Sequence, residues 1–303
     1  MNSFVKGWSH GDFQFKKTFL SILIILLAFT LGNVPILLLP KLFPEFLGDS
    51  MADYFSYFGF ESLFLLQMIP FVAVLLAIIL NNKYIHHRSF RWLFSAREKI
   101  NLRKMILAFS LWGGLLVLNT AIDFALHPQK FEWNFSLLPF LSTFLILMLF
   151  LPLQVAAEEL LFRSFVLQGL FAKTSSVLLS ILISGMMFGF MHFGNPEVLA
   201  NGRWLLIFYV LFGVVLSWIA YKDNGIEVTL GFHYANNFFT GVLLTSDDQA
   251  FQTNALFKTT DVGMDPISLL WLFVNLAVFI LICARCFHWR FRKEANEIPI
   301  EKK

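Results

Sequence analysis

Eight apolar stretches, each about long enough to cross a bilayer as a helix, dominate this sequence. A hydrocarbon core about 30 Å thick requires roughly 20 mainly apolar residues in a helix. Hydrophobic residues make up 57% of the 303 residues and charged residues only 14%, whereas a soluble domain is roughly one quarter charged. The sequence therefore predicts an all-α, polytopic membrane protein. The expected transmembrane helices lie near residues 18–39, 62–81, 105–126, 137–157, 175–194, 204–221, 226–245 and 267–286.

The distribution of Lys and Arg predicts how these spans are oriented. Cytoplasmic segments of membrane proteins carry an excess of these two residues. If the N-terminus is cytoplasmic, only four of the 23 basic residues fall on the opposite side, namely Lys41, Lys130, Arg203 and Lys258. The loops on that side are acidic instead. We therefore expect both termini in the cytoplasm. The protein would lie in the cell membrane of a bacterium or in the endoplasmic reticulum of a eukaryote.

No internal repeat divides the chain, so we expect a single membrane domain over residues 1–303. Residues 1–130 contain the first three spans and a basic cytoplasmic loop at 83–104, and the last span, 267–286, precedes a cytoplasmic tail at 287–303. The net charge of +3 follows from topology signals of this kind. The bilayer is therefore the expected partner, and no nucleic-acid partner is predicted.

Ionisable residues inside the spans are few, and each is a candidate functional residue. Placing one near the bilayer centre costs about 2.5–3.5 kcal/mol on insertion scales. Glu158, Glu159 and Arg163 stand where the fourth span ends, and His192 and His233 lie inside two later spans. Any one of them also suits a structural role, as an interfacial cap or a hydrogen bond between helices. Their coincidence on three spans favours a functional site instead.

Helical spacing divides the two glutamates between two tasks. Residues four apart share a helix face, so Glu159 and Arg163 are expected to form a supporting ion pair. Glu158 is rotated by about 100° from Glu159 and faces another side, where it is available as a general base. Pro152 frees the carbonyl of Met148 and is expected to bend the helix just before the glutamates.

The two membrane histidines have same-face partners and small neighbours. Phe188 stands four residues before His192, and Asn237 four residues after His233. A small-xxx-small pattern, which lets helices approach closely, occurs near both, at Gly185 and Gly189 and at Gly231 and Ala235.

The depths of the two histidines disagree if all helices are straight. At ~1.5 Å per residue, His233 lies about 10 Å from the cytoplasmic start of its span and His192 about 24 Å. Tilt, the bend at Pro152 or a span that starts below the surface would bring them together. We expect Glu158 and His192 within about 8 Å of each other, at a water-filled cavity that opens to the cytoplasmic half.

Three motifs in this order resemble those of a known family. EELLFR at 158–163 matches E-E-x-x-x-R, FGFMH at 188–192 matches F-x-x-x-H, and HYANN at 233–237 matches H-x-x-x-N. Together they are similar to the CPBP family of intramembrane proteases, which includes type II CAAX prenyl endopeptidases and bacteriocin-processing or immunity proteins. The resemblance covers 137–245, roughly a third of the chain, and marks it as the expected catalytic core.

The resemblance implies an intramembrane endopeptidase and a role for each motif residue. Glu158 and His192 match the pair that activates a water molecule to attack the scissile peptide bond. The other matches are His233 and Asn237 at positions that stabilise the oxyanion, and Glu159, Arg163 and Phe188 at supporting positions. The implied substrate is a protein or peptide at the membrane, with prenylated proteins included.

Two other hypotheses remain open from the sequence. Glu158, His192 and His233 form a two-His, one-carboxylate set that also suits zinc with an open fourth position. The chain contains no H-E-x-x-H motif, which would place two ligands on one helix, and we expect no cofactor. The second hypothesis is a non-catalytic immunity protein or a transporter, although transporters often contain inverted repeats.

Overall fold

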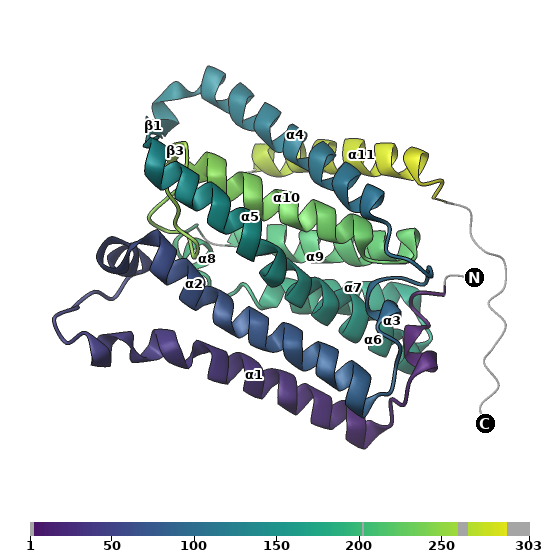
Figure 1. The fold of residues 1–303 in the computed structure, drawn as a ribbon. Coiled ribbons are helices and arrows are strands. Elements are labelled where there is room, and N and C mark those ends of the chain that lie inside the picture. The colour runs from purple at the N-terminus through teal and green to yellow at the C-terminus, as the bar shows by residue number, and fades with distance from the viewer. Residues whose placement is uncertain (1–2, 202, 260–265, 290–303) are drawn as a thin grey trace.

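Helices that run back and forth make up almost all of this computed structural model (Figure 1). The structure describes residues 3–201, 203–259 and 266–289, so the predicted tail lies outside the described residues from 290 onwards. The longest helices are α1 (Phe15–Leu42), α2 (Met51–Leu80), α4 (Leu102–Leu126), α5 (Leu137–Glu159), α9 (Arg203–Asp223) and α11 (Pro266–Cys286). Two shorter helices, α7 (Val177–Phe190) and α10 (Glu227–Leu243), complete the set that runs along the bundle.

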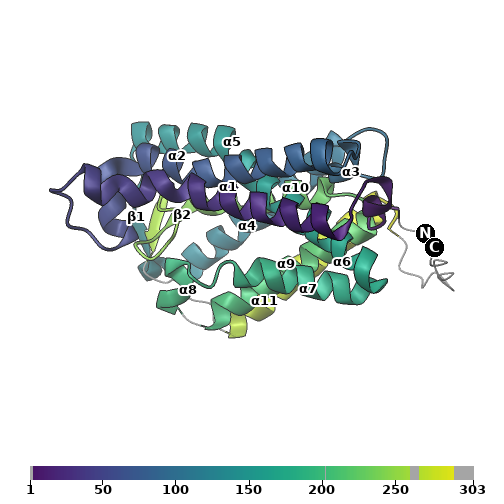
Figure 2. The same cartoon turned by 90° about the horizontal axis from the view of Figure 1, so that it is seen from below.

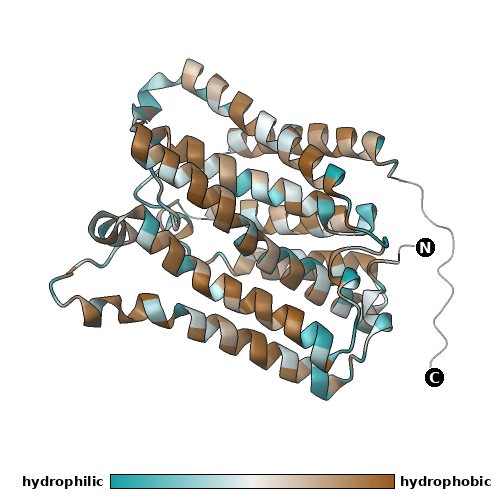
Figure 3. Cartoon of the chain, viewed as in Figure 1, coloured by the Kyte–Doolittle hydropathy of each residue, from teal (hydrophilic) through white to brown (hydrophobic). Residues whose placement is uncertain are grey.

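Within the described residues, six helices are long and apolar enough to cross a membrane. Figure 3 shows hydrophobic residues along them and hydrophilic residues gathered mainly at the two ends of the bundle. The predicted all-α, multi-pass membrane architecture is therefore confirmed, but the predicted number of eight spans is not. The two exceptions are α7, with 14 residues, and α10, with 17, which at ~1.5 Å per residue are about 21 and 26 Å long.

The two short helices differ in how far protein covers them. The central helix α10 packs against α4, α5 and α9, and α7 packs against α9. Because most of its residues are buried, α10 does not have to match the full thickness of the hydrocarbon core, whereas α7 leaves Leu178 and Phe190 exposed. Both segments were predicted as spans from their apolar residues, and both carry or border a motif.

Short elements connect these helices. They are η1 (Gly7–His10), η2 (Asn81–Ile85), α3 (Arg91–Phe94), η3 (Pro128–Lys130), η4 (Leu160–Val166), α6 (Leu167–Thr174) and α8 (Pro196–Asn201). Three short strands form one small sheet in the order β1-β3-β2, with β1 (Phe131–Trp133), β2 (Leu244–Thr245) and β3 (Phe257–Thr259). The strand β1 pairs antiparallel and β2 parallel with β3. Figure 2 shows the sheet at the end of the bundle opposite α3 and α6.

Both ends of the described chain lie at one end of the bundle. The backbone N–H of Phe4 donates to Asn224 Oδ1 (2.7 Å), and Trp289 Nε1 donates to Asp223 Oδ1 (2.9 Å). This shared position agrees with the predicted placement of both termini on one side of the membrane. We refer to this end as the cytoplasmic end and to the opposite one as the outer end.

The basic loop 83–104 folds back onto the cytoplasmic end of the bundle. Burial of a charged side chain requires partners, and three of its basic side chains turn inward to find them. Arg88 donates to Asn82 and Gln168, Arg97 pairs with Asp223 and Glu227, and Lys104 pairs with Asp223. Arg97 and Lys104 therefore hold the α9–α10 connection, while Arg88 holds the start of α6.

Glycines let the central helices approach closely, as the small-residue pattern predicts. A Cβ atom on Gly185 would lie 2.6 Å from the Cα of Val214 in α9, and one on Gly189 would lie 2.6 Å from the Cα of Val210. A Cβ on Gly231 would overlap the backbone carbonyl of Met105 in α4. Backbone atoms cannot move aside cheaply, so these positions accept no larger residue without a shift of the helices.

We expect Gly231→Ala to destabilise the protein by about 1–3 kcal/mol, because the added methyl group overpacks the contact between α10 and α4. Gly114 in α4 is the matched control, since a Cβ there meets nothing within 4 Å. Gly114→Ala should be neutral or stabilise by up to about 1 kcal/mol through helix propensity. Thermal unfolding in detergent measures both. Equal midpoints for the two variants would contradict the close approach.

Candidate active site

The first motif lies where α5 changes its helical geometry. The helix α5 ends at Glu159 and continues directly as the π-helical segment η4, a distortion that often occurs at functional sites. Pro152 lies inside α5 and has no N–H to donate to the carbonyl of Met148. That carbonyl instead accepts a hydrogen bond from the hydroxyl of Tyr234 (3.2 Å). The freed carbonyl predicted from the sequence thus joins α5 to α10 beside the site.

Glu159 and Arg163 form the ion pair that their spacing predicts. Arg163 Nη1 lies 3.1 Å from Glu159 Oε1, and both side chains are fully buried. The Arg163 guanidinium also lies over the ring of Phe188, 4.5 Å from its centre, a favourable cation–π arrangement. Phe188 therefore connects the second motif to the charges of the first.

His233 stands between the two glutamates. Its Nδ1 atom lies 2.9 Å from Glu159 Oε1, and its Nε2 atom lies 3.5 Å from Glu158 Oε2. The rings of Phe188 and Phe212 pack edge-on against the imidazole, with centroids 5.8 and 5.4 Å away. With Nδ1 held by Glu159, Nε2 is the ring nitrogen that faces Glu158.

Glu158 is oriented by a chain of side-chain amides. Gln154 Nε2 donates to Glu158 Oε1 (2.6 Å), and Gln154 Oε1 accepts from Asn237 Nδ2 (3.2 Å). Asn236 Nδ2 donates to Asn237 Oδ1 (3.2 Å), so the Asn237 amide is held with one N–H still to donate. Glu158 Oε2 is buried and accepts no hydrogen bond within the described chain. It is therefore the carboxylate oxygen available to take a proton.

His192 lies in the turn that follows α7. Its Nδ1 atom is 2.9 Å from the carbonyl of Phe188, which can only accept, so Nδ1 carries the proton and Nε2 is an acceptor. The Phe188 ring contacts His192 at a centroid distance of 4.8 Å. The charge of Glu158 acts on His192, but the two side chains share no hydrogen bond in the described part of the chain. A water molecule shared between them stays a prediction.

The structure thus brings five of the seven predicted site residues into one connected network and places the other two beside it. The network residues are Arg163, Glu159, His233, Glu158 and Asn237, while Phe188 and His192 pack against it. Sequence reasoning missed Gln154, which links Glu158 to Asn237. Its signal was present, because Gln154 is a polar residue in an apolar stretch, one turn before Glu158.

The geometry also bears on the zinc hypothesis. Within residues 3–201, 203–259 and 266–289, no three His, Cys, Asp or Glu side chains converge as metal ligands would. Glu158 and His233 face each other, whereas His192 packs against Phe188 and does not complete a ligand set with them. In this arrangement the three predicted ligands do not converge on one point, and an enzyme without a cofactor stays a prediction.

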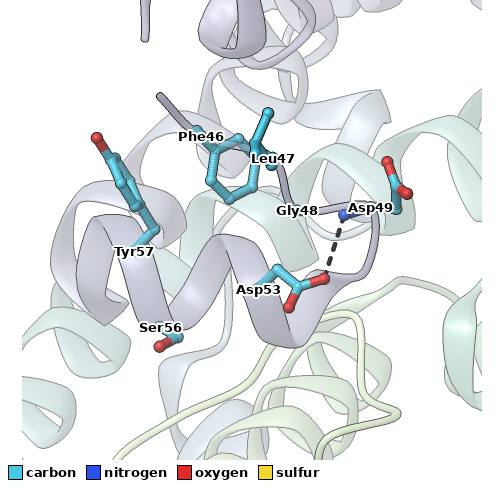
Figure 4. A pocket seen from close by; sticks show the side chains of 7 residues that line it. All are labelled: Phe46, Leu47, Gly48, Asp49, Asp53, Ser56 and Tyr57. Atoms are coloured by element: carbon cyan, nitrogen blue, oxygen red, sulfur yellow. Dashed lines mark hydrogen bonds between the residues drawn. The ribbon is translucent and has the colours of Figure 1, made fainter. Parts of the chain in front are cut away.

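A pocket of about 460 Å³ lies away from the motif residues, in the connection between α1 and α2 (Figure 4). Its lining includes Phe46, Asp49 and Tyr57. Asp53, which also lines it, accepts hydrogen bonds from the backbone of Asp49 and Ser50 and so caps α2. These contacts explain the shape of this turn by helix capping. The predicted water-filled cavity at the motif residues stays a prediction.

Comparisons with known proteins agree with the motifs. Residues 138–239 match the model of the family described as type II CAAX prenyl endopeptidase, Rce1-like. The chain is 27% identical over 264 residues to "Uncharacterized protein YyaK" of Bacillus subtilis (strain 168), which covers 83% of this chain and 85% of that protein. No solved structure matches the chain. The matched family segment covers about a third of the chain and contains all three motifs, which supports the predicted assignment to the CPBP family.

Proposed function

We propose that this protein is an intramembrane endopeptidase that hydrolyses a peptide bond of a membrane-associated or lipid-modified protein. The observation that carries this proposal is the position of His233 between Glu159, at 2.9 Å, and Glu158, at 3.5 Å. A fixed imidazole beside a carboxylate with one free oxygen supplies both a proton acceptor and a hydrogen-bond donor for acyl transfer. The family match supports a membrane endopeptidase as the class of enzyme.

In the first step, Glu158 Oε2 takes a proton from a water molecule while the water oxygen attacks the carbonyl carbon of the scissile bond. His192 Nε2, an acceptor because Nδ1 is bonded to Phe188, helps to orient that water. The new C–O bond forms as the C=O π electrons move to the carbonyl oxygen. The resulting oxyanion accepts hydrogen bonds from Asn237 and from the Nε2–H group of protonated His233, whose Nδ1–H group stays bonded to Glu159.

In the second step, the oxyanion collapses and the C–N bond breaks. The proton held by Glu158 passes to the leaving nitrogen, so that a carboxylic acid and an amine are released and Glu158 returns to its carboxylate form. The fully buried Glu159 holds His233 through Nδ1 in both steps, and Arg163 balances the charge of Glu159. Water is scarce in these surroundings, which strengthens each of these electrostatic contacts.

Cleavage of a farnesylated, internally quenched peptide that ends in Cys-a-a-X tests the proposal, with the unprenylated peptide in parallel. We expect detergent-purified protein to cleave the prenylated peptide, and His192→Ala to lower kcat/KM by about 10²-fold. His127→Ala is the matched control, because the His127 side chain is exposed and bonds to Asp123, away from the motif residues. Activity should persist after treatment with a metal chelator. Loss of activity with chelator and its recovery with zinc would favour the zinc-dependent alternative.

A non-catalytic immunity protein or a transporter makes a different prediction for the same experiment. Neither would cleave any peptide in the series, and neither would depend on His192 for a hydrolytic step. Intact peptides after prolonged incubation with folded protein, over a panel that also includes leader peptides and membrane-protein segments, would therefore count against the endopeptidase.

A further inference from the structure

The ring of His192 requires support from outside its own helix. His192 follows the last residue of α7 by two positions and lies in a turn, so regular helical geometry does not fix its side chain. The bond from Nδ1 to the Phe188 carbonyl (2.9 Å) fixes one point of the ring but leaves rotation about that point. A second contact is needed to set the plane of the imidazole.

Tyr209 of α9 supplies that contact. Its ring stacks on the His192 ring, with centroids 4.1 Å apart and an interplanar angle of 17°. The approach depends on Gly189, where a Cβ would lie 2.6 Å from the Cα of Val210. Because the backbones of α7 and α9 meet at this glycine, the residue before Val210 reaches the imidazole.

Glu197 of α8 holds the other end of Tyr209. The Tyr209 hydroxyl donates to Glu197 Oε1 (2.8 Å), and Asn195 Nδ2 donates to the same oxygen (2.8 Å). The backbone N–H of Ala250, in the outer loop, donates to Glu197 Oε2 (3.0 Å). Glu197 is buried, with 8% of its surface exposed, and a buried carboxylate with several donors holds a defined position.

We propose that Tyr209 and Glu197 are positioning residues for His192: the Tyr209 ring sets the plane of the imidazole, and Glu197 fixes the tyrosine. This inference rests on the proposed function, in which His192 Nε2 orients the attacking water. Neither residue belongs to the three sequence motifs. The outer loop joins the same chain of contacts through Ala250, whose carbonyl accepts from Gln67 Nε2 of α2 (3.0 Å).

Three variants separate the two parts of this proposal. Tyr209→Leu removes the ring, Tyr209→Phe keeps the ring and removes the hydroxyl that bonds to Glu197, and Tyr57→Phe is the matched control. Tyr57 forms the same kind of bond, from its hydroxyl to Glu45 Oε1 (2.7 Å), in the connection between α1 and α2. All three variants are first compared by thermal unfolding in detergent, so that only folded protein is assayed.

With the farnesylated quenched peptide, we expect Tyr209→Leu to lower kcat by about tenfold or more with KM changed less than about twofold, because a misplaced catalytic group slows the chemical step. Tyr209→Phe keeps the ring and should lose less than about threefold, and Tyr57→Phe should equal wild type. Wild-type kcat in Tyr209→Leu, or a loss carried by KM alone, would overturn the proposal.

A second measurement needs no proteolytic activity. Diethyl pyrocarbonate modifies accessible imidazole nitrogens, and mass spectrometry gives the rate at His192 alone. Removal of the covering ring in Tyr209→Leu should raise that rate several-fold, with little change in Tyr209→Phe. An unchanged rate would refute the positioning contact even if the enzyme is active. A raised rate without any peptide cleavage would retain the contact and count against the proposed function instead.

Discussion

Glu158→Gln is expected to lower kcat/KM by about 10³-fold or more while the protein stays folded. The amide keeps the size of the side chain but cannot take a proton from water, and loss of a general base costs about 10²–10⁴-fold. Gln154 can still contact the new side chain, so the surrounding amides should stay in place. The measurement is the rate of cleavage of the quenched peptide by purified protein, together with its unfolding midpoint.

Glu61→Gln is the matched control for this prediction. Glu61 is another carboxylate in a membrane-spanning helix, and the hydroxyl of Ser142 donates to its Oε1 (2.6 Å). In the part of the chain that the structure describes, it forms no hydrogen bond or ion pair with a motif residue, so its replacement should leave kcat/KM within about twofold of wild type. If Glu158→Gln kept most of the activity, or if Glu61→Gln lost as much, Glu158 could not be the base.

Arg163→Met is expected to destabilise the protein by about 3–5 kcal/mol, the usual cost of removing one partner of a buried ion pair. Glu159 and Arg163 are both fully buried, so neither water nor a distant cation can compensate the carboxylate that remains. The unfolding midpoint in detergent should fall steeply. An effect below about 1 kcal/mol, typical of an exposed pair, would mean that this pair does not support the core.

Two further variants sharpen this result. Glu159→Met/Arg163→Met should recover most of the lost stability, because two apolar side chains of similar size often replace a buried pair at little cost. It should nevertheless remain inactive, since His233 loses the oxygen that holds Nδ1. Lys17→Met removes the partly exposed pair with Asp12 and should cost at most about 1 kcal/mol. A fully active double variant would show that Glu159 does not act through His233.

The sequence was sufficient to predict features that depend on residue spacing along a single helix. The spacing of Glu159 and Arg163 predicted their ion pair, and Pro152 predicted a free carbonyl at Met148, although only the structure identifies Tyr234 as its donor. The glycines near His192 likewise predicted a close contact between helices. In each case the sequence separation fixes the geometry, so periodicity alone carries the prediction.

Relations between helices could not be predicted in the same way. Apolar composition marks 175–194 and 226–245 as spans, but it does not reveal that the helices there are short or that protein surrounds α10. Straight helices would place His192 and His233 at different depths in the membrane. In the structure the ring of Phe188 contacts both imidazoles. Tyr209 reaches His192 from α9, a pairing that depends on the crossing of two helices and leaves no trace in local sequence.

The central claim is that residues from separate helices act as one proteolytic unit, and a double-mutant cycle between Glu158 and His233 tests it most directly. Residues that act together are strongly non-additive in their effects on rate. With the farnesylated quenched peptide, Glu158→Gln/His233→Gln should lose no more kcat/KM than the worse of the two single variants. Losses that multiply, or wild-type activity in either single variant, would contradict the account.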